Sequence, residues 1–107
     1  MALFELRQYT IYPGKMDEWL AVMEDEIIPF NIAQGMVVTA SFRGEEDQSV
    51  YIWIRRFEDE AHREKLYEAV YESDHWKTVL LPKLGGLVDR EAHHIQRIIP
   101  TRTSPMQ

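Results

Sequence analysis

The sequence predicts an α+β protein with the chain order β-α-β-β-α-β. Three observations support this prediction. Four segments are rich in β-branched and aromatic residues, two others carry apolar residues at helical spacing, and turn residues separate the segments. The 107 residues have the length of one domain, residues 1–107. This order is that of the ferredoxin-like fold, in which one four-stranded antiparallel sheet carries two helices on one face.

The chain begins with a predicted strand over residues 3–12, LFELRQYTIY, which ends at the turn Pro13-Gly14. A helix follows. Its apolar stripe has the spacing i, i+3, i+4, i+7 and i+11 and consists of Met16, Trp19, Leu20, Met23 and Ile27. Pro29 removes a backbone donor, so we expect the helix to kink or end there, and Gly35 is a C-terminal stop signal.

A hairpin forms the centre of the predicted fold. Residues 36–43 and 50–57 read as strands, and the polar segment GEEDQS, residues 44–49, joins them. The three acidic residues of that segment fit a solvated hairpin tip better than a metal site. Asp59 then follows as an N-cap, because its carboxylate can accept bonds from the free N–H groups of a new helix.

The second helix is predicted to turn Leu66 and Val70 inward, together with Tyr67 and Tyr71. Ser73-Asp74 breaks this helix and starts a shorter piece that ends at Gly85-Gly86. The fourth strand covers residues 89–99 and is closed by Pro100. We expect residues 100–107 to form a polar, extended tail.

Composition excludes several classes of function. The formal charge is −6, with 18 acidic and 12 basic residues. Nucleic acids and anionic membranes bind basic patches, so we expect neither as a partner. The chain has no cysteine, which excludes disulfides, thiolate nucleophiles and zinc–thiolate sites. Without a signal-like N-terminus or a membrane-spanning apolar run, a cytoplasmic location is the expectation.

The third strand indicates what covers the sheet face opposite the helices. Val50, Ile52 and Ile54 form one face of this strand and suit the helix side. The other face presents Tyr51 and Trp53, and a face left in water should be polar. We therefore expect a second copy of the chain to pack there and form a homodimer. The alternative is that C-terminal residues fold back over this face.

The first strand pairs with the third in this topology. Its matching face carries Glu5, Arg7 and Tyr9, which then lie beside the set Tyr51, Trp53 and Arg55. We take these six residues as the candidate ligand-binding site, in a pocket between the sheets of two chains. Two readings stay open. An arginine not paired with Glu5 can hold an anionic or carbonyl-bearing ligand, or the charges form only an internal salt-bridge network.

Histidines are the other candidates for chemistry. His62 is expected to face solvent in the first turn of a helix. A haem-ligand role for His75 is disfavoured, because haem needs a specific axial geometry and a large apolar pocket. His93 and His94 point to opposite strand faces and cannot share a metal ion. At most one of them faces the interior, where it is either a general base or a structural hydrogen-bonding group.

The chain resembles the NIPSNAP family over almost its whole length. The matching pieces are ELRQYTIYPGKMDEW, the stretch from Met23-Glu24 to Pro29, VYIWIRRF, SDHW at 73–76, and RIIP with the later SP. No single piece is specific, but their order and spacing are.

This resemblance implies a domain of the dimeric α/β-barrel group, whose members include antibiotic-biosynthesis monooxygenases, chlorite dismutases, haem-degrading enzymes and muconolactone isomerases. The family itself has no agreed reaction, and fold alone does not give one. We expect a homodimeric barrel that binds a small organic ligand and uses no cofactor or metal, as a monooxygenase or isomerase. The alternative is a non-catalytic dimeric module for protein interaction.

Overall fold

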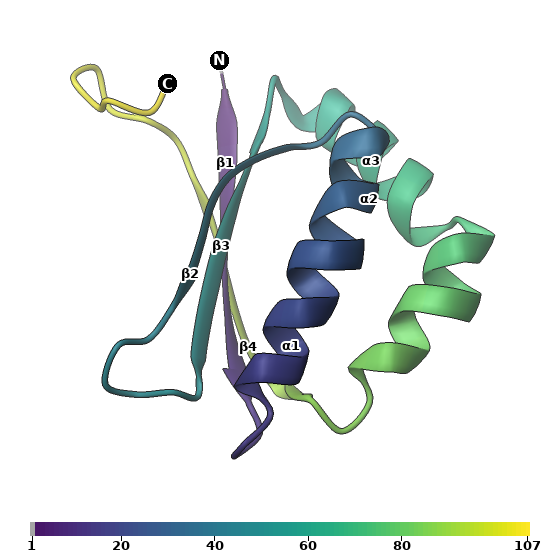
Figure 1. The fold of residues 1–107 in the computed structure, drawn as a ribbon. Coiled ribbons are helices and arrows are strands. Elements are labelled where there is room, and N and C mark those ends of the chain that lie inside the picture. Colours follow the sequence, from purple (N-terminus) through teal and green to yellow (C-terminus); the bar gives the residue numbers. More distant parts are fainter. Residues whose placement is uncertain (1) are drawn as a thin grey trace.

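A computed structural model describes residues 2–107; the first residue of the predicted domain lies outside the described residues. One sheet and two helical segments form two layers (Figure 1). The strands are β1 (Leu3–Ile11), β2 (Val37–Arg43), β3 (Val50–Phe57) and β4 (Val88–Ile98). The helices are α1 (Met16–Val22), α2 (Ile28–Ala33) and α3 (Glu60–Tyr71), joined by the short turns described below. The predicted α+β architecture is confirmed.

The sheet has the order β2-β3-β1-β4, and all three pairings are antiparallel. The central pair sets Glu5 opposite Arg55, Arg7 opposite Trp53, and Tyr9 opposite Tyr51. Because side chains alternate between the two faces of a strand, these residues share one face of the sheet. The sequence therefore placed the six candidate side chains together correctly.

The first helical segment runs through Pro29 rather than ending there. A π-helical turn, Met23–Ile27, precedes the proline, and the amide of Ile28 donates to the carbonyl of Met23 five residues earlier. Pro29 then stands at the start of α2, where a helix does not need the missing N–H. The segment ends at Gly35, whose φ of 102° suits glycine.

The second helical segment starts at Asp59. Its Oδ1 accepts a hydrogen bond from the amide of His62 at 2.8 Å, which confirms the predicted cap. After α3, Ser73 Oγ accepts from the amide of Trp76 at 3.1 Å and restarts the chain as a π-helical turn (Trp76–Leu80) and a 3₁₀ turn (Leu81–Leu84). Within residues 2–107, no helix is both long and apolar enough to cross a bilayer.

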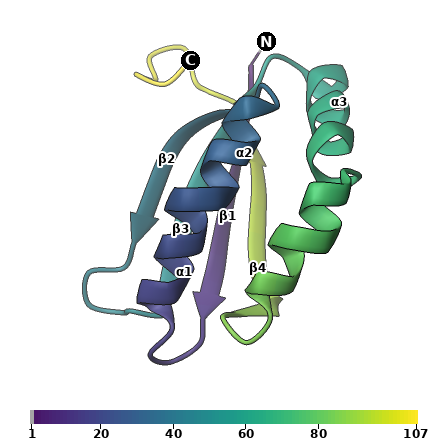
Figure 2. The same cartoon turned by 45° about the vertical axis from the view of Figure 1, so that its right-hand side comes forward.

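Both helical segments cover the same face of the sheet, and β1 and β4 are visible between them (Figure 2). The salt bridge of Lys83 with Glu26 joins the two segments. The buried core includes Trp19, Met23 and Ile27 of the first segment, together with Leu66 and Val70 of the second. Burial thus follows the predicted helical stripes.

The predicted assignment of the two sheet faces is wrong. Tyr51, Trp53 and Arg55 are at most 2% exposed and lie under the helices, whereas Val50, Ile52 and Ile54 lie on the opposite face. The period of two separates two faces but does not say which one meets the helices. The long aromatic and arginine side chains lie on the helix side because helical residues such as Tyr67 satisfy their polar ends.

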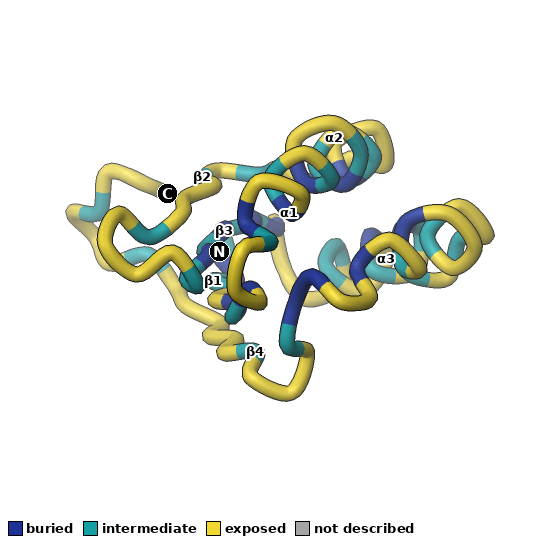
Figure 3. The backbone as a smooth tube through the Cα atoms, turned by 60° about the horizontal axis from the view of Figure 1, so that its bottom comes forward, coloured by how far each residue is buried: buried dark blue, intermediate teal, exposed yellow. Residues whose placement is uncertain are grey.

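The opposite face, here called the outer face, is only partly covered. The C-terminal tail is not extended as predicted: the amide of Ser104 donates to the carbonyl of Thr101, and Arg56 Nε donates to the carbonyl of Gln107 at 2.7 Å. The looped tail packs near Phe4 at one end of the outer face. Figure 3 shows the tail mostly in the exposed colour.

Candidate functional site

A buried ion cluster lies between the sheet and α3. Glu5 and Arg55 are 1% and 0% exposed, and Arg55 Nη2 donates to Glu5 Oε1 at 2.6 Å. Tyr67 OH donates to the Glu5 carboxylate and lies 2.5 Å from Oε1 and 2.6 Å from Oε2. Arg55 Nη1 also donates to Asn31 Oδ1 and to Tyr71 OH. The buried charges are therefore paired, as burial requires, and Arg55 Nε is the nitrogen of this guanidinium left without a hydrogen bond within residues 2–107.

Arg7 belongs to this cluster but, unlike Arg55, has a terminal nitrogen that is not bonded within residues 2–107. Its Nε donates to Tyr9 OH at 2.6 Å, and its Nη1 donates to Glu5 Oε1 and to Tyr67 OH, both at 3.0 Å. Within residues 2–107, Nη2 of Arg7 makes no hydrogen bond, and the side chain is 15% exposed. Arg7 thus keeps one charged donor group for another partner.

The cluster contains more positive than negative charges. Glu5 receives bonds from Arg7, Arg55 and Arg63, and among the described residues only Arg63 of these also bonds a second carboxylate, that of Glu60. Two guanidinium groups therefore share one buried carboxylate. One positive charge is left over at the sheet–helix interface, and an anionic group complements it.

The environment fixes the ionisation of these groups. Burial alone would raise the pKa of Glu5, but Arg55 and the hydrogen bond from Tyr67 outweigh it and lower the pKa to about 2. Burial raises the pKa of Tyr67 to about 12. Burial disfavours the Arg7 cation, yet Tyr9 and the neighbouring groups raise its pKa. At neutral pH the cluster holds a carboxylate, charged arginines and neutral phenols.

A pocket of about 370 Å³ opens beside Arg7, between the sheet and the two helical segments. Its apolar wall combines aromatic and aliphatic side chains from both helical segments and the sheet, namely Trp19, Met23, Ile27, Trp53, Trp76, Leu84 and Val88. Its polar groups are Arg7, Tyr9, Tyr67, Tyr71, Arg90 and His93. An apolar wall with a few polar groups at one side is typical of a small-molecule site.

A register break between β1 and β4 supplies two of these polar groups. Gln8 pairs with His94 and Thr10 with Asp89, so residues 90–93 lie opposite Tyr9 alone. The extra residues form an irregularity of the bulge type, which redirects side chains. Arg90 and His93 both line the pocket, and the His93 ring stacks on the Tyr9 ring with a centroid distance of 4.1 Å.

His93 is a neutral base in this setting. Burial lowers the pKa of His93, and the nearby cations of Arg7 and Arg90 lower it further, while Asp89 opposes them. Its Nε2 is buried and has no hydrogen-bond partner within residues 2–107. The sequence left open which of His93 and His94 faces inward. His94 is exposed and pairs with Gln8 of the outer face, so the inward residue is His93.

The six predicted site residues divide into two groups. Arg7, Tyr9 and Trp53 line the pocket, and Trp53 Nε1 donates to Tyr9 OH at 3.0 Å. Glu5 and Arg55 lie behind them in the ion cluster, and Tyr51 shares a hydrogen bond with Ser41. All six face the helices. The prediction that they lie on the sheet face away from the helices, between the sheets of two chains, is therefore wrong.

The other histidines lie outside this pocket. His62 Nδ1 accepts a hydrogen bond from the amide of Glu58 at the start of α3. His75 is exposed and packs its ring near Phe30. Among residues 2–107, no three histidine or acidic side chains gather as a metal site would require.

Comparison with known proteins decides the family. The family model named NIPSNAP matches residues 4–105, which is nearly the whole chain. The chain belongs to the NIPSNAP family. No curated protein matches the sequence.

Solved NIPSNAP structures share the fold of this chain. A NIPSNAP family protein from Agrobacterium tumefaciens is 24% identical, with full coverage of both chains and a TM-score of 0.87. An uncharacterized NIPSNAP domain protein from Burkholderia xenovorans is 21% identical, covers 96% of this chain and 98% of its own, and has a TM-score of 0.83. SnoaB, a cofactor-independent oxygenase from Streptomyces nogalater, is 16% identical over 97% of each chain, with a TM-score of 0.73.

Sequence reasoning missed the half of this NIPSNAP pocket that the helices supply. Trp19 was expected only as part of an apolar helical stripe, and Tyr67 and Tyr71 were expected only to face inward. A usable signal is present in their chemistry. Core helices are usually lined with aliphatic residues, whereas these stripes also carry Trp19, Tyr67 and Tyr71, aromatic residues with a polar group, which are common where a wall meets a ligand. Arg90 carries no comparable signal, because it reaches the pocket only through the register break.

Proposed function

We propose that this NIPSNAP protein binds a small, planar organic molecule that carries a carboxylate or carbonyl oxygen. The proposal depends on the position of Arg7, which lies at the edge of a pocket with aromatic side chains in its wall. Within residues 2–107, Arg7 Nη2 has no hydrogen-bond partner. The excess positive charge around Glu5 favours an anionic group there. The pocket of about 370 Å³ is of a size for a ligand with one or two rings.

The phenol of Tyr9 supports the same ligand class. Its oxygen accepts hydrogen bonds from Arg7 Nε and Trp53 Nε1, so its own proton is free to be donated to a ligand oxygen. We propose that the protein acts on this ligand without a cofactor, as an isomerase or monooxygenase. The likeness in fold to SnoaB, a cofactor-independent oxygenase, supports this class without naming a substrate.

The proposal includes a homodimer that forms through the outer face. Phe42 is 62% exposed and Val37 is 45% exposed on β2, and Ile52 and Ile54 lie beside them on β3. An apolar sheet face of this kind is typically buried against a partner, and the same surface of a second copy gives a closed two-fold arrangement. In this arrangement each chain keeps its own pocket on the helix side.

Binding to a defined set of aromatic acids tests the function. Isothermal titration with benzoate, phenylacetate, benzoylformate and phenylpyruvate is expected to detect binding of at least one. Arg7→Lys and Arg7→Met are expected to weaken that binding about 10-fold or more, because a bond to a charged group contributes about 1.5–3 kcal/mol. Arg43→Met, at an exposed arginine outside the pocket, is the matched control. Failure of the wild-type protein to bind any of the four acids contradicts the proposal.

A further inference from the structure

The pocket contains one group that ligand binding alone does not need, the side chain of His93. A positively charged histidine would serve an anion site better than a neutral one. The structure does the opposite: burial and the neighbouring cations of Arg7 and Arg90 keep the pKa of His93 below its usual value. The imidazole is therefore available as a proton acceptor at neutral pH.

The geometry positions this acceptor beside the ligand-binding groups. His93 stacks on Tyr9 with a centroid distance of 4.1 Å, and the Tyr9 hydroxyl accepts from Arg7 Nε at 2.6 Å. A ligand oxygen held by Arg7 and Tyr9 therefore has His93 at the adjacent wall of the same pocket. Nε2 of His93 is buried and without a partner within residues 2–107.

We propose that His93 is the general base of this pocket and removes a proton from the carbon next to a ligand carbonyl group. The C–H bond breaks, its proton goes to the basic ring nitrogen of His93, and its electron pair moves into the new C=C bond as the carbonyl oxygen becomes an enolate. Arg7 and the Tyr9 hydroxyl hold that oxygen. Return of the proton to another atom gives an isomer, and no oxidant is consumed. This inference rests on the proposed function and gives its ligands a class, the enolisable aromatic keto acids.

The groups around His93 determine how the rate of the proposed proton transfer depends on pH. Arg7 and Tyr9 face it from β1, Asp89 and Arg90 lie near it on β4, and the phenols of Tyr67 and Tyr71 line the same pocket from α3. The base works only when neutral. Because its pKa is lowered, the rate should rise with pH in the acidic range and be constant from neutral pH up to the range where tyrosines ionise.

Exchange of phenylpyruvate protons in D₂O, followed by proton NMR, tests the inference. The wild-type protein is expected to accelerate loss of the benzylic proton signal over buffer. His93→Asn should reduce this acceleration about 100-fold or more, the usual contribution of a general base. It should change the dissociation constant of benzoylformate, which has no enolisable carbon, far less than it changes the exchange rate. His94→Asn, the neighbour on the outer face, is the matched control and should exchange protons at the wild-type rate.

The outcomes separate the two proposals. Wild-type protein that binds aromatic keto acids but does not accelerate exchange overturns the role of His93 and leaves the binding function intact. Exchange that persists in His93→Asn, or a rate that does not change with acidic pH, overturns it as well. A protein that binds none of the acids overturns both proposals. A folded circular-dichroism spectrum of His93→Asn ensures that lost exchange reports the missing base.

Discussion

Glu5 is the residue that holds the buried cluster together. Its carboxylate accepts hydrogen bonds from Arg7, Arg55, Arg63 and Tyr67 while its side chain is 1% exposed. Without it, three guanidinium groups would lie beside one another with no common counter-charge, which is costly in a buried site. Glu5 therefore positions Arg7, and Arg7 in turn forms part of the pocket wall.

Replacing Glu5 with Gln is expected to make stability less dependent on pH. The pKa of Glu5 is about 2 in the folded protein, compared with an ordinary value of 4.5 when the chain is unfolded. A lowered pKa stabilises the fold above pH 4.5, and this contribution disappears as the pH falls toward 2. Urea unfolding should give a difference between wild type and Glu5→Gln of about 3 kcal/mol at pH 7 that shrinks toward zero near pH 2.

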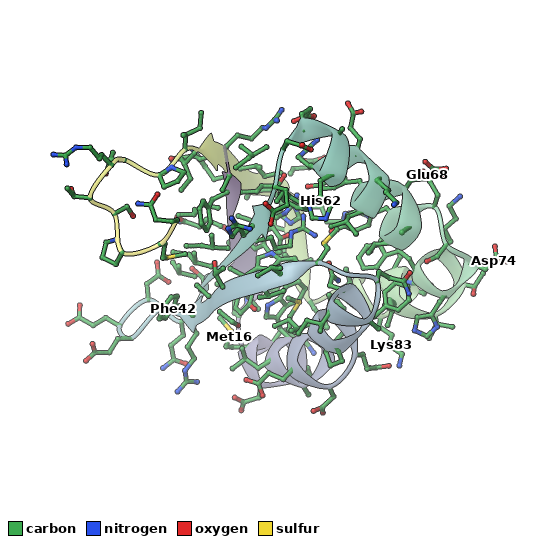
Figure 4. All side chains as sticks on the ribbon, turned by 90° about the horizontal axis from the view of Figure 1, so that it is seen from above. Met16, Phe42, His62, Glu68, Asp74 and Lys83 are labelled. Carbon is green, nitrogen blue, oxygen red and sulfur yellow. The ribbon has the colours of Figure 1, made fainter. Side chains whose placement is uncertain are left out.

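Glu68→Gln is the control for this experiment, because Glu68 is exposed on α3 (Figure 4) and should leave the pH profile unchanged. An equal difference between wild type and Glu5→Gln at pH 7 and pH 2.5 would contradict the account of Glu5.

At the scale of elements, local signals in the sequence predicted where each strand and helix lies. β3 has the predicted bounds, and Asp59 and Gly35 mark helix ends as expected. These signals depend on neighbouring residues only. The passage of the first helical segment through Pro29 was not predictable in the same way, because it needs a π-helical turn that the packing of that segment stabilises.

The assignment of the sheet faces failed for a related reason. Alternation along β3 is a local pattern, but the choice of the buried face depends on groups supplied by α3 and by Asn31 of the first helical segment. The six candidate residues could be grouped from the sequence because they share a sheet face. The helical half of the site and the register break of β4 come from contacts between distant segments, which sequence spacing alone does not give.

Removing the cap of α3 tests the local part of this account. Asp59→Ala loses the bond from the His62 amide and should lower the free energy of unfolding by about 1 kcal/mol. Asp59→Asn keeps an acceptor at the same position and should recover most of the loss. Urea denaturation followed by circular dichroism measures both variants. Equal stability of Asp59→Ala and wild type would show that the cap contributes nothing.

At the scale of the whole molecule, the two sheet faces have different tasks. The helix side encloses the pocket and the ion cluster, and the outer face presents aliphatic side chains that the C-terminal tail covers only near Phe4. Figure 4 shows Phe42 on β2, far across the molecule from Glu68 and Asp74 of the second helical segment. A dimer through the outer face thus leaves both pockets accessible from the helix side.

The proposed dimer predicts that stability depends on protein concentration. Sedimentation of the wild-type protein should give twice the chain mass of 12.7 kDa at micromolar concentration, and its Tm should rise with concentration, since association stabilises only the folded state. Phe42→Asp puts a charge into the proposed interface, so it should sediment as a monomer with a constant Tm. Val79→Asp, at another exposed apolar residue on the helix side, should remain dimeric. A monomeric wild-type protein at these concentrations would contradict the dimer but not the pocket, which lies within one chain.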